Sequence, residues 1–473
     1  MMRNEVFGTA LLLAGFSWGG ALDNAWVKGV TDKDALSYRT GEKIVFTLTM
    51  QGLDGAPPAG EYFLDWKRSG DDAVCATGRI DLVACPFVYE TTIDRPGFVR
   101  LQAKVVGKDG KPFKKRYTGD ATTPEGKKAM NAFEKKNREV FFDGSAGAEV
   151  ATLRTEPEPE DFDAFWKKQF ARLDRVPLKA ETVELECRKP SVRVFAVQVA
   201  CAGLRPTTGY LSVPRDTEKG RTYPAVLSLH GYSGAMGMHH PALKDPPDDK
   251  IVFDINAHGM KLPAFGATEA DLRALRWEVK SGGLSYAFDP KQNADPEIAY
   301  FNGMVLRIKR ALQYLKTVKG WDGRNLVSKG GSQGGLQSMW AAGLVEDLTV
   351  SRPEVPWCAD LGPDAVPGRV APGWRIAWTP GIAYYDCVNH AKRAKGRVEI
   401  TRAGLGDTCC MPSSIAALYN NLPADRRSIV WVQGSKHGYV PPMPNQSVSL
   451  PSGKTVAPYQ GADVFTGDKL PTK

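Results

Sequence analysis

The segment at residues 330–335, with the sequence GGSQGG, constrains the fold more than any other stretch of the chain. A short strand-like segment, residues 325–329, precedes it, and residues 336–344 interleave small and apolar side chains as a helix does. A Gly-x-Ser-x-Gly sequence between a strand and a helix forms a sharp, strained turn that exposes the serine at the carboxyl end of the strand. The pattern therefore predicts a nucleophile elbow with Ser332 at its tip.

The motif by itself is a weak indicator, because glycine makes up 48 of the 473 residues. A second match, GFSWG, occurs at residues 15–19 inside an apolar leader that has no strand before it. That copy predicts no elbow, and the assignment of Ser332 depends on whether the rest of the chain supplies the partners that a serine nucleophile needs.

The first 21 residues have the features of a modest secretory signal peptide. Arg3 supplies a positive charge, residues 6–16 are apolar, and residues 19–21 are small enough for cleavage. The apolar run is too short to span a bilayer, and no other stretch approaches the required length. Residues 1–21 thus predict a secreted or periplasmic protein without a membrane span. An ordinary N-terminal strand or helix is the alternative.

The eight cysteines fit an oxidising compartment only in part. Cys75 and Cys85 flank a short strand-like run, and Cys187 and Cys201 bracket a hairpin pattern. Either pair could form a disulfide or remain as thiols, and the spacing does not decide between them. No cysteine or histidine spacing is typical of a zinc site. We therefore expect no zinc site, and no motif that we identify calls for a cofactor.

A length of 473 residues predicts two domains. The net charge of +9 is spread over scattered lysines and arginines. No interleaving of basic and aromatic residues indicates a nucleic-acid partner. The charge is compatible with an acidic polysaccharide without indicating one.

Residues 22–118 consist of short alternating segments separated by turns rich in glycine and proline. The clearest are residues 43–50, 61–66 and 97–105. Strands at this spacing predict an immunoglobulin-like β-sandwich. The region contains no catalytic constellation, so two roles stay open. It is either a carbohydrate-binding or assembly module, or a spacer that covers the neighbouring domain, which we favour.

Residues 119–154 are expected to form a polar linker with one charged helical stretch. Residues 155–473 have a different pattern of apolar residues. After a helix opening and a hairpin, continuous apolar strands alternate with helices, which predicts a mainly parallel sheet covered on both faces. With the elbow in its middle, this is an α/β-hydrolase arrangement. The strands expected in it are residues 225–229, 251–255, 325–329, 355–360, 398–403 and 428–432.

A serine hydroxyl needs a base within hydrogen-bond reach, and the base needs a carboxylate to orient it. On this fold the chain order is Ser, then Asp or Glu, then His. Two of the six histidines follow Ser332. His390 lies in a helical pattern, whereas His437 follows the expected strand at residues 428–432. We therefore predict His437 as the base.

The acid should follow the preceding strand, residues 398–403. The loop after it contains one carboxylate, Asp407, with Asp360 and Asp364 as alternatives near an earlier strand. Two backbone N–H groups should stabilise the oxyanion. We predict those of Gln333, directly after the nucleophile, and of Tyr232, in a loop after an early strand.

His230 precedes the serine and is expected to support the Tyr232 loop instead of acting as the base. Tyr232 and Trp357 are also candidate substrate-binding residues.

Five stretches carry a family resemblance: residues 159–166 (PEDFDAFW), 230–232 (HGY), 330–335, 383–389 (AYYDCVN) and 407–414 (DTCCMPSS). Through them, residues 155 to about 440 resemble carbohydrate esterase family seven, the acetyl xylan esterases and cephalosporin C deacetylases. The family's nucleophile, acid and base fall on Ser332, Asp407 and His437, and its oxyanion donors on Tyr232 and Gln333. The resemblance implies metal-independent removal of small acyl groups, chiefly acetate, from xylo-oligosaccharides and related acetylated carbohydrates.

Three departures from the family pattern leave some properties open. Residues 256–259 read NAHG where an Arg-Gly-Gln motif is usual, which leaves the acyl preference and a homo-oligomer undecided. The β-domain is additional to the family core, and residues 441–473 form a Pro/Gly-rich tail where a closing helix is expected. Two other functions are weighed: a hydrolase of bulkier acyl, methyl-uronate or peptide substrates, and a non-catalytic glycan-binding protein.

Overall fold

The fold is given by a computed structural model, which describes residues 21–135, 138–155, 157–233, 245–362, 374–442, 445–449 and 455–460. The predicted signal peptide, residues 1–21, lies outside these ranges except for its last residue. None of the helices in the described part is long and apolar enough to cross a membrane.

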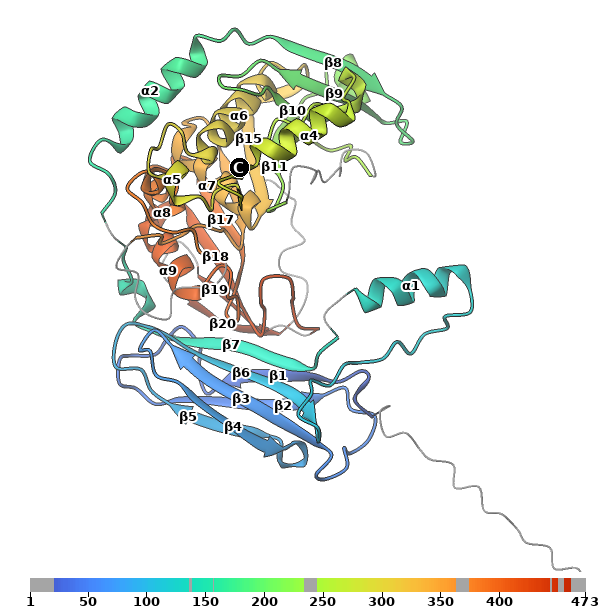
Figure 1. The fold of residues 1–473 in the computed structure, drawn as a ribbon, viewed down its shortest axis with the longest axis vertical. Coiled ribbons are helices and arrows are strands. Elements are labelled where there is room, and N and C mark those ends of the chain that lie inside the picture. The colour runs from blue at the N-terminus through green and yellow to red at the C-terminus, as the bar shows by residue number, and fades with distance from the viewer. Residues whose placement is uncertain are drawn as a thin grey trace, which may run out of the picture.

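Two antiparallel sheets form the N-terminal part, drawn in blue and cyan in Figure 1. One has the strand order β1-β2-β5 and the other β4-β3-β6-β7. Alternate side chains of both, such as Phe46 of β2 and Leu101 of β6, share one buried apolar core. We call these seven strands the N-terminal sheets. Their elements are β1 Trp26–Thr31, β2 Ile44–Gln51, β3 Tyr62–Gly70, β4 Ala76–Asp81, β5 Phe87–Thr91, β6 Gly97–Gly107, α1 Pro124–Glu134 and β7 Phe141–Ala148.

Strand β7 lies in the range where a polar linker was expected. Its sequence, FFDGSAGA, shows no alternation of polar and apolar residues, and all eight residues are buried. Phe142 and Ala146 face the core of the N-terminal sheets, whereas Asp143 lies against Gly406 and Ser145 against Leu405, in the rest of the protein. A strand covered on both faces lacks the period-two pattern by which strands are recognised. Helix α1 occupies the expected charged stretch.

The remainder of the chain forms an eleven-stranded sheet with the order β20-β19-β18-β17-β16-β15-β11-β12-β10-β9-β8. The six strands from β12 to β18 in this order are parallel, and the strands beyond them at both ends are antiparallel. The mainly parallel sheet predicted from the sequence is therefore present. Helices α6, α7 and α9 pack against it.

The strands of this sheet are β8 Ala180–Leu185, β9 Val192–Val199, β10 Thr207–Pro214, β11 Tyr223–Leu229, β12 Ile251–Asn256, β15 Trp321–Gly331, β16 Val350–Glu354, β17 Arg397–Gly404, β18 Arg427–Gln433, β19 Asn445–Ser449 and β20 Thr455–Gln460. A small hairpin consists of β13 Lys280–Ser281 and β14 Leu284–Ser285. The helices are α2 Phe162–Asp174, α4 Glu269–Glu278, α5 Pro290–Asn293, α6 Tyr300–Leu315, α7 Gln333–Leu344, α8 Cys387–Ala391 and α9 Pro412–Asn421.

The strand expected at residues 355–360 is wrong, because β16 ends at Glu354. The chain then leaves the sheet in a loop in which Val355, Cys358 and Asp360 have φ angles of 37°, 56° and 61°. These left-handed conformations do not fit a strand. The carboxylate of Asp386 holds the loop, since it accepts hydrogen bonds from the backbone N–H groups of Asp360 and Leu361.

The eight cysteines are all free in the structure. Cys75 is exposed, and Cys85, Cys187 and Cys201 are partly buried. Neither pairing that the spacing left open is therefore formed.

Candidate active site

The turn after β15 holds Ser332 in a strained conformation, with φ 59° and ψ −117°. Such a conformation costs on the order of 1–3 kcal/mol and occurs mainly at functional sites. The turn is tight because α7 begins at Gln333, and a Cβ atom on Gly334 would lie 2.2 Å from the carbonyl oxygen of Leu229. Glycine is therefore required at this position, as the motif predicted.

Ser332, His437 and Asp407 form a continuous hydrogen-bonded line. The ring nitrogen Nε2 of His437 lies 3.0 Å from the hydroxyl of Ser332, and Nδ1 lies 3.0 Å from Oδ2 of Asp407. The Asp407 side chain is fully buried. Its other oxygen accepts hydrogen bonds from the backbone N–H groups of Cys409 and Cys410, at 2.8 and 3.0 Å. The structure thus brings together the three residues that the sequence proposed as a triad.

The alternative residues lie elsewhere. His390 is fully buried on α8, where its Nε2 lies 3.0 Å from the carbonyl oxygen of Tyr384. Burial lowers the pKa of His390 to about 3, so it is a neutral side chain of the core. Asp360 belongs to the loop that Asp386 holds. Asp364 lies outside the described residues.

Arg402 holds the loop that carries His437, and sequence reasoning missed it. Its guanidinium contacts the carbonyl oxygens of Lys436 and His437 at 3.4 and 3.3 Å and the hydroxyl of Ser435 at 3.2 Å. It also pairs with Glu354, at 2.7 Å through Nε. Its strand, β17, reads RVEITRAG and alternates polar with apolar residues, so the sequence did not distinguish Arg402 from the other charged residues of the strand.

The two predicted oxyanion donors lie on segments that one side chain connects. Gln333 is the first residue of α7, so its N–H has no acceptor within the helix. The hydroxyl of Tyr286 lies 2.5 Å from the side-chain oxygen of Gln333 and 3.2 Å from the carbonyl oxygen of Ser233, the neighbour of Tyr232. The Tyr286 and Tyr232 rings also stack, with centroids 4.5 Å apart. Tyr286, which the sequence did not single out, therefore contacts both segments.

His230 supports the Tyr232 loop, as expected. Its Nε2 accepts a hydrogen bond of 2.9 Å from the backbone N–H of Ala257. The adjacent His258 contacts the hydroxyl of Tyr300 at 2.8 Å and the carbonyl oxygen of Ser233 at 3.3 Å. The NAHG segment, residues 256–259, thus lies beneath the loop as part of the floor of the site.

An aromatic wall adjoins the candidate oxyanion loop. The ring of Tyr232 lies 5.4 Å from that of Trp357 and 5.2 Å from that of Trp374, between centroids. Trp357 is almost fully buried, whereas Trp374 is 43% exposed. Of the two tryptophans, Trp374 is therefore the better placed to contact a ligand, although only Trp357 was a sequence candidate.

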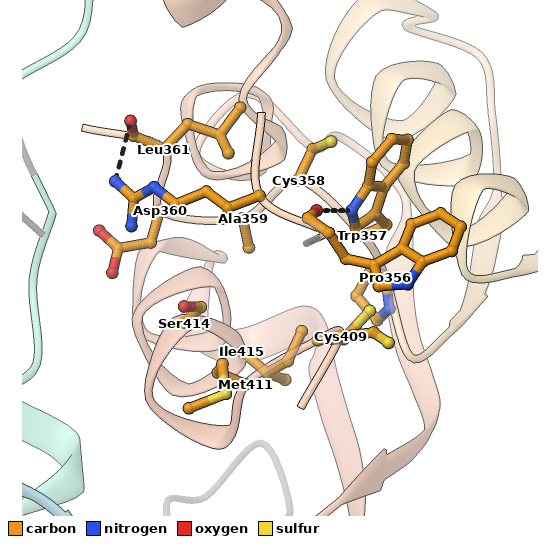
Figure 2. A pocket seen from close by; sticks show the side chains of 13 residues that line it. Pro356, Trp357, Cys358, Ala359, Asp360, Leu361, Cys409, Met411, Ser414 and Ile415 are labelled. Atoms are coloured by element: carbon orange, nitrogen blue, oxygen red, sulfur yellow. Dashed lines mark hydrogen bonds between the residues drawn. The ribbon is translucent and has the colours of Figure 1, made fainter. Parts of the chain in front are cut away.

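Figure 2 shows the small pocket behind this wall, between the loop at residues 356–361 and α9. Its volume is about 30 Å³, which is room for about one water molecule. The indole N–H of Trp357 donates to the carbonyl oxygen of Trp374 at one edge. Burial and then the charge of Asp407 raise the pKa of Cys409, which lines the pocket, to about 11. Its thiol is therefore protonated at neutral pH.

Among the described residues, one group could supply three metal ligands: Asp407, Cys409 and His437, whose ligand atoms lie within 4.8 Å of one another. The Asp407 and His437 atoms are already joined by a hydrogen bond. A metal ion would have to replace the proton between them. We assign no metal to this group.

Comparison with protein families decides the class of this chain. The family model for acetyl xylan esterases (AXE1) matches residues 148–362 and 378–450, more than half of the sequence. The chain belongs to the acetyl xylan esterase family. It is therefore a carboxylic ester hydrolase of the α/β-hydrolase type, which confirms the family and the enzyme class expected from the sequence motifs.

Individual relatives of this esterase are distant. The acetyl esterase Axe7A of Xylanibacter ruminicola is 25% identical over 427 residues, 86% of each chain. The solved acetyl xylan esterase from Paenibacillus sp. R4 is 24% identical and covers 62% of this chain and 94% of its own, with a TM-score of 0.49. Acetyl xylan esterase 1 from Thermoanaerobacterium sp. JW/SL YS485 is 21% identical and covers 61% and 92%, with a TM-score of 0.48.

Proposed function

We propose that this member of the acetyl xylan esterase family is a secreted serine esterase. It removes acetyl groups from xylan, xylo-oligosaccharides or related acetylated sugars through an acyl-enzyme. The observation that carries the proposal is the line from Ser332 through His437 to Asp407, in which both hydrogen bonds measure 3.0 Å.

In the first half-reaction, Nε2 of His437 takes the proton of the Ser332 hydroxyl as the oxygen attacks the acetyl carbonyl. Asp407 accepts the Nδ1 hydrogen bond, which fixes the tautomer and stabilises the imidazolium. The backbone N–H groups of Gln333 and Tyr232 bind the oxyanion. His437 then gives its proton to the sugar oxygen, which leaves, and the acetyl group stays on Ser332.

In the second half-reaction, a water molecule gives a proton to His437 and attacks the acetyl carbonyl. The tetrahedral species collapses with return of a proton to the Ser332 oxygen, and acetate is released. Both half-reactions use the same base and the same pair of N–H groups. The positions of these groups therefore matter for acylation and deacylation alike.

The remaining parts of the chain have their own proposed roles. Residues 1–21 direct export, which brings the enzyme to polymeric substrates outside the cytoplasm. The N-terminal sheets are an immunoglobulin-like sandwich that extends past residue 118 to include β7. Residues 155–473 are the esterase domain, in which Tyr232 and Trp374 contact the sugar.

The test is acetate release from acetylated xylan, from acetylated xylo-oligosaccharides and from an aryl acetate, with Ser332→Ala as the control. We expect the parent protein to release acetate from all three. The variant should lose at least about 10⁴-fold in turnover while its melting temperature stays within a few degrees. A fluorophosphonate should label the parent at Ser332, and activity retained by Ser332→Ala would refute the proposal.

Other specificities of the same site are distinguished by substrate. A butyrylated sugar, a methyl uronate and a peptide, run beside the acetylated substrates, report acyl size and leaving group. Faster turnover of any of these than of the acetyl ester would keep the triad but replace the substrate class. A protein that binds xylan without labelling by the fluorophosphonate would be a glycan-binding protein instead.

A further inference from the structure

The face of β7 that points away from its own core contacts two loops. One carries Asp407 and is called the acid loop here, and the other carries His437 and is called the base loop. On this face Ser145 is 1% exposed, and its hydroxyl donates a 2.5 Å hydrogen bond to the backbone carbonyl oxygen of Leu405. Leu405 lies two residues before Asp407. The N-terminal sheets therefore hold the backbone of the acid loop directly.

The backbone of Ser145 also pairs with the side chain of Gln433. The Ser145 N–H donates to the Gln433 amide oxygen at 3.1 Å, and the Gln433 amide nitrogen donates to the Ser145 carbonyl oxygen at 2.9 Å. Gln433 is the last residue of β18, four residues before His437. A Cβ atom on Gly144 would lie 2.1 Å from the Gln433 amide oxygen, so glycine permits this pairing.

The acid loop also packs on β7 through its backbone. A Cβ atom on Gly406 would lie 1.9 Å from the carbonyl oxygen of Asp143, so the two backbones meet without an intervening side chain. The Asp143 carboxylate is itself fixed by Arg100, at 2.7 and 2.5 Å. The acid loop and the base loop are in turn joined, because the N–H of Gly406 donates to the carbonyl oxygen of Ser435 at 2.9 Å.

A second contact lies at the far end of the acid loop. The hydroxyl of Ser413, in the first turn of α9, donates to the carboxylate of Asp71 at 2.7 Å. The same Asp71 oxygen accepts the N–H of Phe98 at 2.9 Å. Both Asp71 and Ser413 are buried. The acid loop is thus held before Asp407 by Ser145 of β7 and after it by Asp71, the residue that follows β3.

We propose that the N-terminal sheets are a positioning part of the active site, in which Ser145 fixes the acid loop and the base loop relative to each other. A spacer would need only apolar contacts, such as that between Phe98 and Trp431, whose ring centroids are 5.9 Å apart. The hydrogen bonds of Ser145 instead end on the segments that set the Asp407–His437 distance. The inference rests on the proposed function, because it assumes that these two residues act on Ser332.

The first experiment compares Ser145→Ala with the parent protein in the full chain, with an aryl acetate as the substrate. Loss of the hydroxyl releases the Leu405 carbonyl, and a shift of the acid of a fraction of an ångström should lower kcat by about 10- to 100-fold. KM should change by less than about threefold, because the hydrogen bonds of Ser145 go to Leu405 and Gln433 and not to the residues proposed to bind the substrate. Ser212→Ala is the matched control.

Ser212 is a fully buried serine on β10 whose hydroxyl has no hydrogen-bond partner among the described residues. Its truncation removes the same atom from the interior without touching either loop. We expect kcat to stay within about twofold of the parent value. An unchanged kcat in Ser145→Ala, or an equal loss in Ser212→Ala, would overturn the inference.

The second experiment separates positioning from a general loss of folded protein by repeating Ser145→Ala in an Asp407→Ala background. If Ser145 acts through the acid, the loss of kcat should shrink to less than about threefold once the acid is absent. A loss of the same size in both backgrounds would show a merely structural role. Fluorophosphonate titration of the parent and Ser145→Ala gives kcat per active site.

If Ser145→Ala does not fold, Ser413→Ala takes its place in both experiments. Asp71 keeps the N–H of Phe98 as a donor in that variant, which limits the disturbance. A loss of kcat that depends on Asp407 supports the inference, and an unchanged kcat overturns it. Failure of the proposed function is distinct: it would appear as activity in Ser332→Ala, whatever the Ser145 variants do.

Discussion

The hydroxyl group of Tyr286 lies 2.5 Å from the side-chain amide of Gln333. The same hydroxyl is 3.2 Å from the carbonyl oxygen of Ser233. A phenol has one proton, so it donates to one of these acceptors at a time. Because Gln333 and Tyr232, the neighbour of Ser233, are the proposed oxyanion donors, Tyr286 sets the spacing between them.

Replacement Tyr286→Phe should therefore lower kcat for an aryl acetate by about tenfold. This is less than the 10²- to 10³-fold that loss of a donor itself costs, since both N–H groups remain. The ring and its stacking on Tyr232 are retained. The control is Tyr314→Phe, because Tyr314 is also buried but lies on α6, away from the two N–H groups. Equal kcat in the two variants would contradict the prediction.

Replacement Asp407→Asn should lower kcat by about 10³- to 10⁴-fold, with little change in stability. An asparagine oxygen can still accept the N–H groups of Cys409 and Cys410, so the loop keeps its shape. Its NH₂ group then donates to Nδ1 of His437. The neutral ring therefore carries its proton on Nε2, and this tautomer cannot take the proton of Ser332. Steady-state kinetics and thermal unfolding check this. A tenfold loss or less would contradict the assignment of the acid.

Replacement Gly334→Ala should destabilise the protein by roughly 1–3 kcal/mol, the usual cost of overpacking. The new methyl group would lie 2.2 Å from a carbonyl oxygen of β11, and neither backbone can move freely. Gly438→Ala is the control, because no atom lies within 4 Å of its Cβ position. Urea unfolding of both variants gives the comparison, and equal stabilities would mean that the elbow is less tight than described.

Four buried groups should make stability depend on pH in opposite directions. Burial lowers the pKa of His258 and of His390 to about 3, from 6.5. Their contribution is present above pH 6.5 and is lost as the pH falls toward 3, because the unfolded chain binds protons that the folded chain does not. Burial raises the pKa of Asp254 and of Asp386 to about 7, from 3.8. Their contribution is present below pH 3.8 and is lost as the pH rises toward 7.

In the parent protein the opposing contributions of the histidines and the aspartates to stability offset each other. Variants that each remove one group should reveal them between about pH 4 and pH 6.5. Removing one histidine in His390→Gln should change the stability difference from the parent by about 1.4 kcal/mol per pH unit, in favour of the variant at the lower pH. Asp254→Asn should tilt the difference the other way by a similar amount. Urea unfolding at pH 4.5 and pH 6 measures both. Two tilts of the same sign would contradict the assignment.

Replacement Trp374→Ala should raise KM for an acetylated xylo-oligosaccharide by roughly fivefold, equivalent to about 1 kcal/mol of aromatic contact. The aryl acetate, which lacks the sugar, should be affected much less. Trp277→Ala on α4 is the control, since that ring is 81% exposed. Equal effects on both substrates would mean that Trp374 supports Tyr232 and does not contact the sugar.

The sequence was sufficient to predict the candidate triad, because the fold dictates the order of such residues along the chain. Ser332 follows a strand and precedes a helix, and Asp407 and His437 follow the next suitable strand ends, so periodicity and motif spacing sufficed. Tyr286 and Ser145 carry no such signal. Each acts through contacts with segments tens or hundreds of residues away, and a single tyrosine or serine in a sequence does not show what lies opposite it.

The same limit explains the two differences in the fold. Strand β7 is covered on both faces and rich in small residues, so it has neither the alternation nor the bulky apolar run that marks a strand. The segment at residues 355–360 has apolar residues at the right place for a strand. Its path is decided by the buried carboxylate of Asp386, which lies 25 and 26 residues further along the chain from the two N–H groups it accepts.

The pairing of Ser145 with Gln433 has a consequence for how the enzyme is made. These two residues are 288 positions apart, and His437 comes later still in a chain of 473 residues. Contacts between such distant segments form late in folding, because the intervening chain must first be ordered. The contacts of the N-terminal strands with the active-site loops therefore form only after the C-terminal part of the chain has been synthesised. We expect a growing or prematurely ended chain to be inert toward esters, with hydrolysis beginning only once the whole polypeptide has folded.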